Sequence, residues 1–270
     1  GIKTEIKMIK PSVTLSLMAP YGVPFLRPQI KEPWPDLVIA AGRKTIPYLR
    51  YIKKTSKTVC KTIYLQDPKI DSKEFDIVWA PTYDAIDGDN VIKTVTSPNR
   101  VTDQLLNTQH SEWLKILSKL KGPFVGFLIG GKSKAFSFNN KDCEKILTAL
   151  SNVINKGYTP LITMSRRSPK ILSDRIRDLL GNKNNLFYDG NGPNPYFAIL
   201  KVSEVIIATP DSANMISETL NVPKPLYYID LKSNSKRFNK FINILRNSGH
   251  IRPFKNNIEL FDNKKLDPTQ

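Results

Sequence analysis

The segment that most restricts the fold is a short apolar run, Val205–Ala208, which stops at a polar turn ending in Asp211 and Ser212. A run this short and this apolar predicts a strand buried on both faces of a sheet. Asp211 and Ser212 are good caps for a helix that begins at once, with its free N–H groups pointing out of the strand end. Such a helix start can bind an anion. Glu218 follows one to two turns later, within reach of a hydroxyl-bearing group such as a ribose.

The rest of the chain alternates apolar strands with amphipathic helices. This alternation predicts parallel sheets with crossover helices. Strands are predicted over Lys3–Ile9, Leu37–Ala41, Thr58–Leu65, Ile77–Ala80, Val91–Thr94, Phe124–Ile129, Thr159–Thr163, Asn185–Tyr188, Glu204–Ala208 and Pro225–Ile229. Helices are predicted over Thr45–Lys53, Val101–Leu120, Lys141–Lys156, Lys170–Leu180, Tyr196–Val202, Ser212–Asn221 and Lys236–Ser248.

A domain boundary is predicted within Gln109–Pro123, where a long helix ends in Lys121-Gly122-Pro123 and the strand pattern restarts. We therefore expect residues 1–115 and 116–250 to form two separate α/β domains with a cleft between them. The tail, residues 251–270, is expected to cross back and pack on the first domain.

Composition predicts a soluble globular protein of the cytoplasm. The 270 residues are 40% hydrophobic and 24% charged, without a run long enough to span a membrane and without a basic-then-apolar leader. Cys60 and Cys143 lie far apart with no CxxC pair, which argues against a structural zinc site and a disulfide framework.

The net charge of +17, with a pI near 9.7, admits phosphates, nucleotides, anionic lipid or nucleic acid as partners. Much of the excess Lys could instead reflect A/T-rich codons, because Asn and Ile are abundant too. No recognised nucleic-acid module occurs, so nucleic acid is not the expected partner. Attraction to an anionic membrane surface would make the protein peripheral to a membrane.

Polar residues recur just after the predicted strands, where ligands bind in open α/β sheets. Gly130 and Gly131 permit a tight turn whose amides could cradle a phosphate, and Ser133 and Lys134 could add a hydroxyl and a charge. Neither a Walker loop nor a GxGxxG motif is present, so a plain turn between strand and helix is the alternative.

Two further polar stretches follow later strands. Arg166 and Arg167 could grip a diphosphate with their planar guanidinium groups, or could simply be an exposed helix start. The stretch Asp189–Tyr196 is rich in Gly, Asn and Pro and predicts a loop suited to be the wall of a base-binding site. Tyr196 could stack on a ring or belong to the core.

The best candidate for a general base is Asp67, which follows a predicted strand, and Asp84 is the second choice. His110 and His250 are both ambiguous.

The quoted segments, taken together, resemble one family. In order from Pro35 to Pro253, the residues that carry the resemblance are Pro35–Arg43, Gln66–Pro68, Asn99–Thr102, Leu128–Lys134, Thr163–Arg167, Asp189-Gly190, Asn194–Tyr196, and Asp211-Ser212 with Met215 and Glu218. They resemble the mitochondrial-fission "elongated mitochondria" (ELM) family, in a bacterial-type member. That family is similar in pattern to GT-B glycosyltransferases.

The resemblance implies a fold and a site. It implies two Rossmann-like domains with parallel sheets facing across a cleft, an acceptor-side domain over residues 1–115 and a nucleotide-sugar-binding domain over residues 116–250. The nucleotide-sugar would be the substrate, with no cofactor and no metal, and Glu218 would contact the ribose. The residues expected to bind it are Gly130, Gly131, Ser133, Lys134, Ser165, Arg166, Arg167, Asp189, Gly190, Asn194, Tyr196, Asp211, Ser212, Met215 and Glu218. Those expected on the acceptor side of the cleft are Gly42, Arg43, Asn99 and Arg100.

Two functions fit the resemblance. One is a metal-independent, nucleotide-sugar-dependent glycosyltransferase. The other is a non-catalytic adaptor that recruits a protein partner, as plant members are implicated in recruiting a dynamin-related protein. Met18–Trp34, rich in Pro and aromatic residues, could be a contact loop or ordinary packing. Compared with the family, the first domain is expected to lack an initial strand–helix unit.

Overall fold

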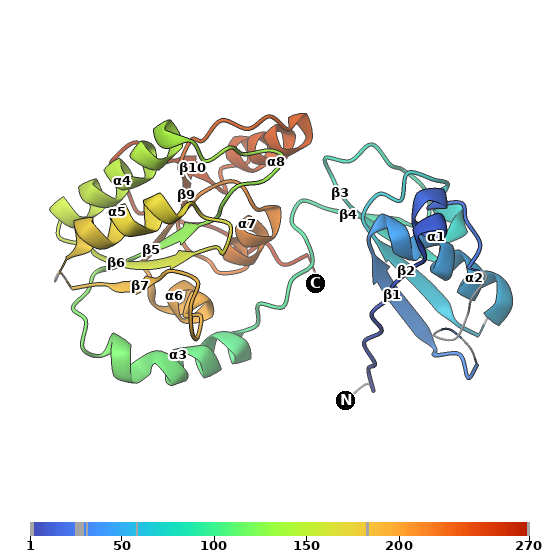
Figure 1. The fold of residues 1–270 in the computed structure, drawn as a ribbon. Helices are drawn as coiled ribbons and strands as arrows, with labels where there is room; N and C mark the ends of the chain where they lie inside the picture. Colours follow the sequence, from blue (N-terminus) through green and yellow to red (C-terminus); the bar gives the residue numbers. More distant parts are fainter. Residues whose placement is uncertain (1–2, 25–29, 31, 58, 182–183, 269–270) are drawn as a thin grey trace. The chain divides into compact units, whose positions relative to one another are not determined.

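Two parallel sheets form in the chain, one in each of two units, Gly1–Thr94 and Val95–Gln270 (Figure 1). This computed structural model describes residues 3–24, 30, 32–57, 59–181 and 184–268. Part of the predicted contact loop (residues 25–29 and 31) and Thr58, the first residue of a predicted strand, lie outside the described residues. The predicted α/β class with two parallel sheets is confirmed.

The sheet of the first unit contains β1 (Leu37–Ala41), β2 (Lys61–Leu65), β3 (Ile77–Pro81) and β4 (Val91–Thr94), in the order β1-β2-β3-β4. The helix α2 (Ile46–Ser56) packs on β1 and β2. The core of this first unit consists of Ile46, Leu49, Tyr64, Phe75 and Val78. The remaining helical segments of the unit are α1 (Val13–Met18) and the short 3-10 turns Arg43–Thr45 and Ser72–Glu74.

The strand predicted at Lys3–Ile9 is wrong, because these residues have no regular secondary structure and pair with no strand. Apolar and charged residues alternate there, as in a half-buried strand. Yet Ile6 and Met8 are both exposed, so the pattern has no core to face. Alternation alone does not form a strand when a neighbouring strand and a core are missing.

The sheet of the second unit is larger, and the order in which the chain adds strands to it reverses at its middle. Its strands are β5 (Phe124–Ile129), β6 (Thr159–Met164), β7 (Leu186–Tyr188), β8 (Val205–Ala208), β9 (Leu226–Tyr228) and β10 (Arg252–Pro253). Their order is β10-β9-β8-β5-β6-β7, and every pair is parallel. The chain therefore proceeds outward from β5 in one direction and, starting with β8, outward in the other. The boundary between β5 and β8 is a topological switch point.

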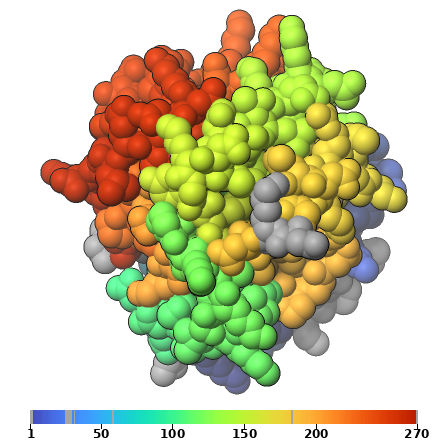
Figure 2. All heavy atoms as spheres, turned by 90° about the vertical axis from the view of Figure 1, so that its left-hand side faces the viewer, coloured from blue at the N-terminus to red at the C-terminus, as the bar shows by residue number. Residues whose placement is uncertain are grey.

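Helices cover both faces of this sheet (Figure 1). On one side, α4 (Asn140–Asn155) packs on β6 and on α5 (Lys170–Leu180). On the other side, α6 (Tyr196–Val202) packs on β5 and β6. The outer surfaces of α4, in yellow-green, and α5, in yellow, can be followed in Figure 2. The remaining helices are α7 (Ala213–Leu220) and α8 (Lys236–Asn247).

The boundary between units lies before the one predicted within Gln109–Pro123, because α3 (Asp103–Leu117) belongs to the second unit. This helix packs on α6. The segment before it is tied to the same unit, since the Ser97 amide donates to the Ser217 hydroxyl at 2.9 Å. Sequence periodicity identified the helix correctly but carried no information about its packing partner.

The C-terminal tail packs on the second unit, contrary to the prediction that it crosses back to the first. Phe254, Ile258 and Phe261 pack against the core of the second unit, which includes Tyr227. The Leu266 amide donates to the Leu220 carbonyl at 2.8 Å. Aromatic residues spaced along the tail thus fix it beside β9.

We predict that Leu150→Ala lowers the free energy of unfolding by about 2–5 kcal/mol, because Leu150 of α4 is fully buried and truncation leaves a cavity in the core. Thr148→Ala on the exposed face of the same helix is the control and should change it by less than about 0.5 kcal/mol. Urea unfolding followed by circular dichroism measures both. Equal losses would show that α4 does not pack as described.

Candidate functional site

The carboxyl ends of β5, β6 and β8 bring three loops of the second unit together. Adjacent parallel strands end at the same edge of a sheet, and here that edge includes the switch point between β5 and β8. Gly130 and Gly131 follow β5, Arg166 and Arg167 follow β6, and Asp211 follows β8. The polar residues predicted at these strand ends are therefore neighbours in space.

The centre of this edge is the buried carboxylate of Asp211. It accepts a hydrogen bond from the Thr209 hydroxyl at 2.6 Å and one from the Gly131 amide at 3.0 Å. The Gly130 amide donates to the Thr209 hydroxyl oxygen at 2.8 Å. Burial raises the pKa of Asp211, while these hydrogen bonds and the nearby Arg167 oppose the rise. The carboxylate thus fixes the loop after β5 to the end of β8.

The two glycines are required by close packing. A Cβ on Gly130 would lie 2.0 Å from an oxygen of Asp211, and one on Gly131 would lie 2.2 Å from the carbonyl carbon of Arg167. Their amides were expected to cradle a phosphate. Instead they donate to Thr209 and Asp211, so the polar groups of the protein itself satisfy them.

Two arginines lie at the open side of this network. Arg167 is half exposed, lies 3.8 Å from the Asp211 carboxylate and donates to the Lys132 carbonyl at 3.3 Å. Arg166 is exposed, and its side chain passes close to Gly190. Ser165 caps this turn by accepting the Arg167 amide at 3.2 Å. The arrangement presents positive charge at the strand ends.

The start of α7 faces the same edge, capped by Ser212, whose hydroxyl accepts the Met215 amide at 3.3 Å. Asp211 was also expected to cap this helix, but its carboxylate turns inward to Gly131 instead. Glu218, half-buried on α7, lies beside the Tyr196 hydroxyl. That hydroxyl donates a hydrogen bond to the Met215 carbonyl at 3.5 Å. Burial, followed by the charge of Glu218, raises the pKa of Tyr196 well above its usual range. Tyr196 therefore stays a neutral phenol beside a carboxylate.

The loop after β7 is shaped by its own side chains. Burial tends to raise the pKa of Asp189, but hydrogen bonds from Asn191 and Arg177 outweigh it and lower the pKa. Asn194 accepts from the Tyr196 amide at 3.0 Å and from the Thr163 hydroxyl at 3.3 Å, which joins this loop to β6. Gly190 supplies the positive φ of 108° that the turn needs.

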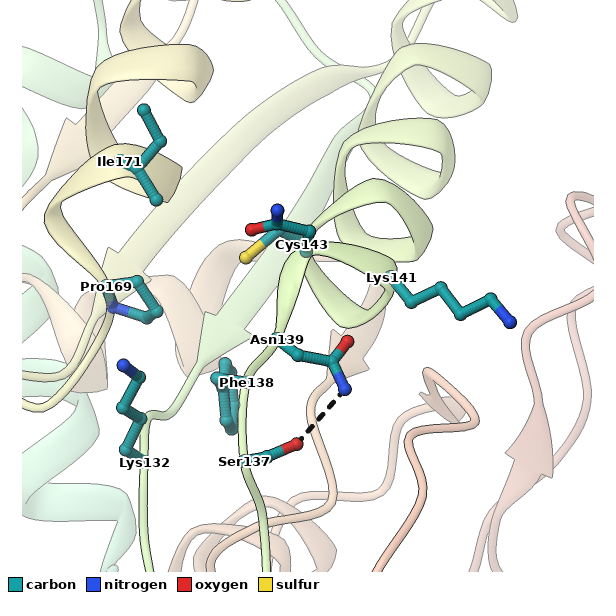
Figure 3. Close-up of a pocket in the computed structure, with 9 residues that line it drawn as sticks. Lys132, Ser137, Phe138, Asn139, Lys141, Cys143, Pro169 and Ile171 are labelled. Carbon is teal, nitrogen blue, oxygen red and sulfur yellow. Dashed lines mark hydrogen bonds between the residues drawn. The ribbon is translucent and has the colours of Figure 1, made fainter.

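In the loop after β5, Ser133 has a structural role: its hydroxyl oxygen accepts the Ala135 and Phe136 amides, each at 3.2 Å. Lys134 is exposed. The neighbouring Lys132 points into a pocket of about 610 Å³ between the starts of α4 and α5, as does the sulfur of Cys143 (Figure 3). Burial raises the pKa of the Cys143 thiol, so it stays protonated. The side chain of Lys141 points away from this pocket (Figure 3).

The candidates of the first unit have partners within that unit. Asp67, the expected general base, accepts hydrogen bonds from the amide and the ammonium group of Lys69 at 2.8 and 2.5 Å. Gly42 has a φ of 92°, and Arg43 donates to the Ala19 carbonyl. Asp84 is buried. Their catalytic or binding roles remain predictions.

Asn99 and Arg100, expected on the acceptor side, belong to the second unit. Asn99 accepts from the Asn221 side chain at 2.9 Å, and the Arg100 guanidinium lies over the Phe197 ring at 5.1 Å. Both therefore anchor the segment before α3 to α6 and α7. Their sequence position gave no sign of this, because the boundary was placed too late in the chain.

Three contributors to the site were not selected from the sequence. They are Thr209, Ser168, whose hydroxyl donates to the Gly130 carbonyl, and Lys132. Thr209 had a usable signal, since it is a polar residue at the end of an apolar run directly before Asp211. Ser168 had no such signal in the sequence, because its hydrogen bond joins the segment after β6 to the segment after β5.

Among the residues that the structure describes, no cluster of three or more His, Cys, Asp or Glu side chains could hold a metal ion. None of the helices in this part of the chain has the length and apolar character to cross a membrane.

The architecture has counterparts among solved structures. The UDP-GlcNAc 2-epimerase from Methanocaldococcus jannaschii superposes with a TM-score of 0.54 at 14% identity, covering 83% of this chain and 67% of that one. The two parallel sheets, with a switch point lined by polar loops, define a glycosyltransferase-like α/β fold of GT-B type.

Sequence comparison gives the family. The model of the mitochondrial fission ELM1 family matches residues 1–270, and the chain belongs to that family. An uncharacterized protein of Rickettsia prowazekii is 26% identical over 274 aligned residues, covering 87% of this chain and 76% of its own. The mitochondrial fission protein ELM1 of Arabidopsis thaliana is 24% identical over 244 residues, covering 82% of this chain and 57% of its own. The chain thus spans little more than half of the Arabidopsis relative.

We predict that Asp211→Ala lowers the free energy of unfolding by about 1–3 kcal/mol, because the buried Gly131 amide loses its acceptor. Asp174→Ala, at an exposed position of α5, is the control and should change it by less than about 0.5 kcal/mol. Urea unfolding compares the two. A loss no greater than that of the control would contradict the central role of the Asp211 carboxylate.

The raised pKa of Asp211 also predicts a pH dependence. A folded-state pKa above the unfolded value of about 3.8 means that the folded protein binds the proton more tightly. The extra stability that comes from this tighter proton binding is therefore fully present below the unfolded pKa and is lost as pH rises through the folded pKa. The stability advantage of wild type over Asp211→Asn should shrink as pH rises from about 3 to 7, as measured by urea unfolding at each pH. An advantage that grows over this range would contradict the shift.

Proposed function

We propose that the chain is a nucleotide-sugar-dependent glycosyltransferase whose second unit binds the nucleoside diphosphate. The observation that carries the proposal is the convergence of the Asp211 network, two arginines and the start of α7 at the switch point between β5 and β8. Open α/β sheets bind ligands at this place. The name of the Methanocaldococcus jannaschii protein, a UDP-GlcNAc 2-epimerase, contains a UDP-sugar. This supports the proposal that a nucleotide-sugar is the ligand here.

The diphosphate would lie between the arginines and the start of α7. Arg166 and Arg167 supply planar cationic groups suited to phosphate oxygens, and a helix start favours an anion. The Asp211 network has a positioning role, because its hydrogen bonds hold the loop after β5 against the end of β8. Glycine is the only residue that fits at positions 130 and 131 in this arrangement. The phosphates would thus approach the backbone closely.

The ribose and base would extend along α7 toward the loop after β7. Glu218 offers a half-buried carboxylate that can accept hydrogen bonds from ribose hydroxyls, and the neighbouring Tyr196 phenol shares that surface. Gly190 and Asn194 shape the wall beside Arg166. These positions agree with the roles that the family resemblance implies.

In the transfer step, the oxygen of an acceptor hydroxyl forms a bond to the anomeric carbon while the bond from that carbon to the diphosphate breaks. The diphosphate leaves with the electron pair, and the arginines stabilise its added charge. A general base takes the proton of the acceptor hydroxyl. Asp67 stays our candidate for this base, and its carboxylate accepts a hydrogen bond from the Lys69 ammonium group.

The alternative is an adaptor that keeps the fold but works by binding another protein. The exposed apolar residues of the first unit favour it, as does the name of the Arabidopsis relative, which assigns that protein to mitochondrial fission. An adaptor would not need the Asp211 network to serve a nucleotide.

We predict that UDP or another nucleoside diphosphate binds the protein and that Glu218→Gln weakens binding about 10- to 100-fold, because hydrogen bonds to the charged carboxylate are lost. Calorimetric titration with UDP, GDP, ADP and the corresponding nucleotide-sugars measures this. Glu204→Gln is the matched control, since Glu204 is an exposed carboxylate just before the other end of β8. Binding by none of these nucleotides, or equal weakening in both variants, would overturn the proposal.

A further inference from the structure

Large apolar side chains crowd the surface of residues 3–24. Seven of them are more than half exposed: Ile6 at 89%, Met8 at 81%, Val13 at 79%, Leu17 at 77%, Met18 at 53%, Tyr21 at 67% and Val23 at 54%. Isolated apolar residues are normal on a protein surface, but a group of this size within one segment marks an interaction surface.

The first unit itself fixes the orientation of α1 and of the apolar side chains that this helix carries. Leu15 and Ala19 are buried, and Ser12 caps α1 by accepting the Leu15 amide at 3.2 Å. The Ala19 carbonyl accepts a hydrogen bond from Arg43 of the segment after β1, and the Pro20 carbonyl accepts one from Arg50 of α2. With Leu15 buried against the unit, Val13 and Leu17 are held on the opposite face of α1, whereas Met18 lies beside the buried face and is about half exposed.

Cationic groups accompany this apolar surface. Residues 3–24 contain Lys3, Lys7 and Lys10 and a single carboxylate, Glu5, which lies 3.7 Å from Lys7. The whole chain carries a net charge of +17. Apolar side chains interspersed with lysines suit the boundary between lipid headgroups and acyl chains, where the apolar groups insert and the lysines reach the headgroup phosphates.

We propose that residues 3–24 dock the protein on an anionic lipid bilayer, with Leu17 and Met18 inserting and Lys3 and Lys10 contacting the headgroups. Charge complementarity selects this partner: each lysine near an anionic bilayer adds to the attraction, and the strongly positive chain adds a long-range component. The surface lies wholly in the first unit, so the inference does not depend on nucleotide binding by the second.

The test is flotation of the full chain with two kinds of vesicle, phosphatidylcholine alone and an equal mixture of phosphatidylcholine and phosphatidylglycerol. We expect the protein to float with the mixed vesicles and to be released by salt. Lys3→Glu/Lys10→Glu should weaken binding at least about tenfold, and Leu17→Asp/Met18→Asp should do the same. The lysine variant changes residues outside any helix or strand, so it does not depend on α1 staying folded.

The control is Lys240→Glu/Leu260→Asp, an exposed lysine and an exposed leucine of the second unit, which should bind as wild type does. Four outcomes would overturn the proposal: no flotation with the mixed vesicles, equal flotation with phosphatidylcholine alone, equal weakening in the control, or self-association through residues 3–24 without lipid binding. The last is detected by light scattering of the wild type and the Leu17→Asp/Met18→Asp variant.

Discussion

The candidate site depends on the hydrogen bonds that the buried carboxylate of Asp211 accepts. This carboxylate joins two loops that are remote in sequence, because it accepts the Gly131 amide after β5 and the Thr209 hydroxyl after β8. A buried carboxylate needs such partners, since an unsatisfied charge in the interior is costly. The contact also explains the Gly-Gly sequence, which leaves room for Asp211 on one side and for the backbone of Arg167 on the other. The need to pair these buried polar groups with hydrogen-bond partners thus shapes the edge at which the two arginines and α7 meet.

Much of the fold could be predicted from the sequence, because apolar periodicity and turn residues specify strands and helices locally. The run Val205–Ala208 is a buried strand, and Ser212 caps the helix after it, as predicted. Packing partners could not be predicted. Helix α3 was identified but assigned to the wrong unit, and the tail was expected on the first unit although its aromatic residues pack around Tyr227. The pattern in Lys3–Ile9 resembled a strand but had no sheet to join.

The site could be predicted by position but not by role. Strand ends brought the expected residues to one edge, since that follows from parallel topology alone. The directions of hydrogen bonds did not follow: the amides of Gly130 and Gly131 face protein acceptors, and Asp211 turns inward instead of capping α7. The chain belongs to the ELM1 family and has a GT-B-type fold, whereas nucleotide binding at this edge and catalysis are both our proposals.

The most direct test of this account is to map where a nucleoside diphosphate binds, by following backbone amide NMR shifts of the full chain during titration with UDP. The account predicts that the largest shifts fall at Arg166, Arg167 and the first turns of α7 up to Glu218. Shifts centred instead on the pocket beside Lys132 and Cys143, or the absence of any saturable shift, would contradict it.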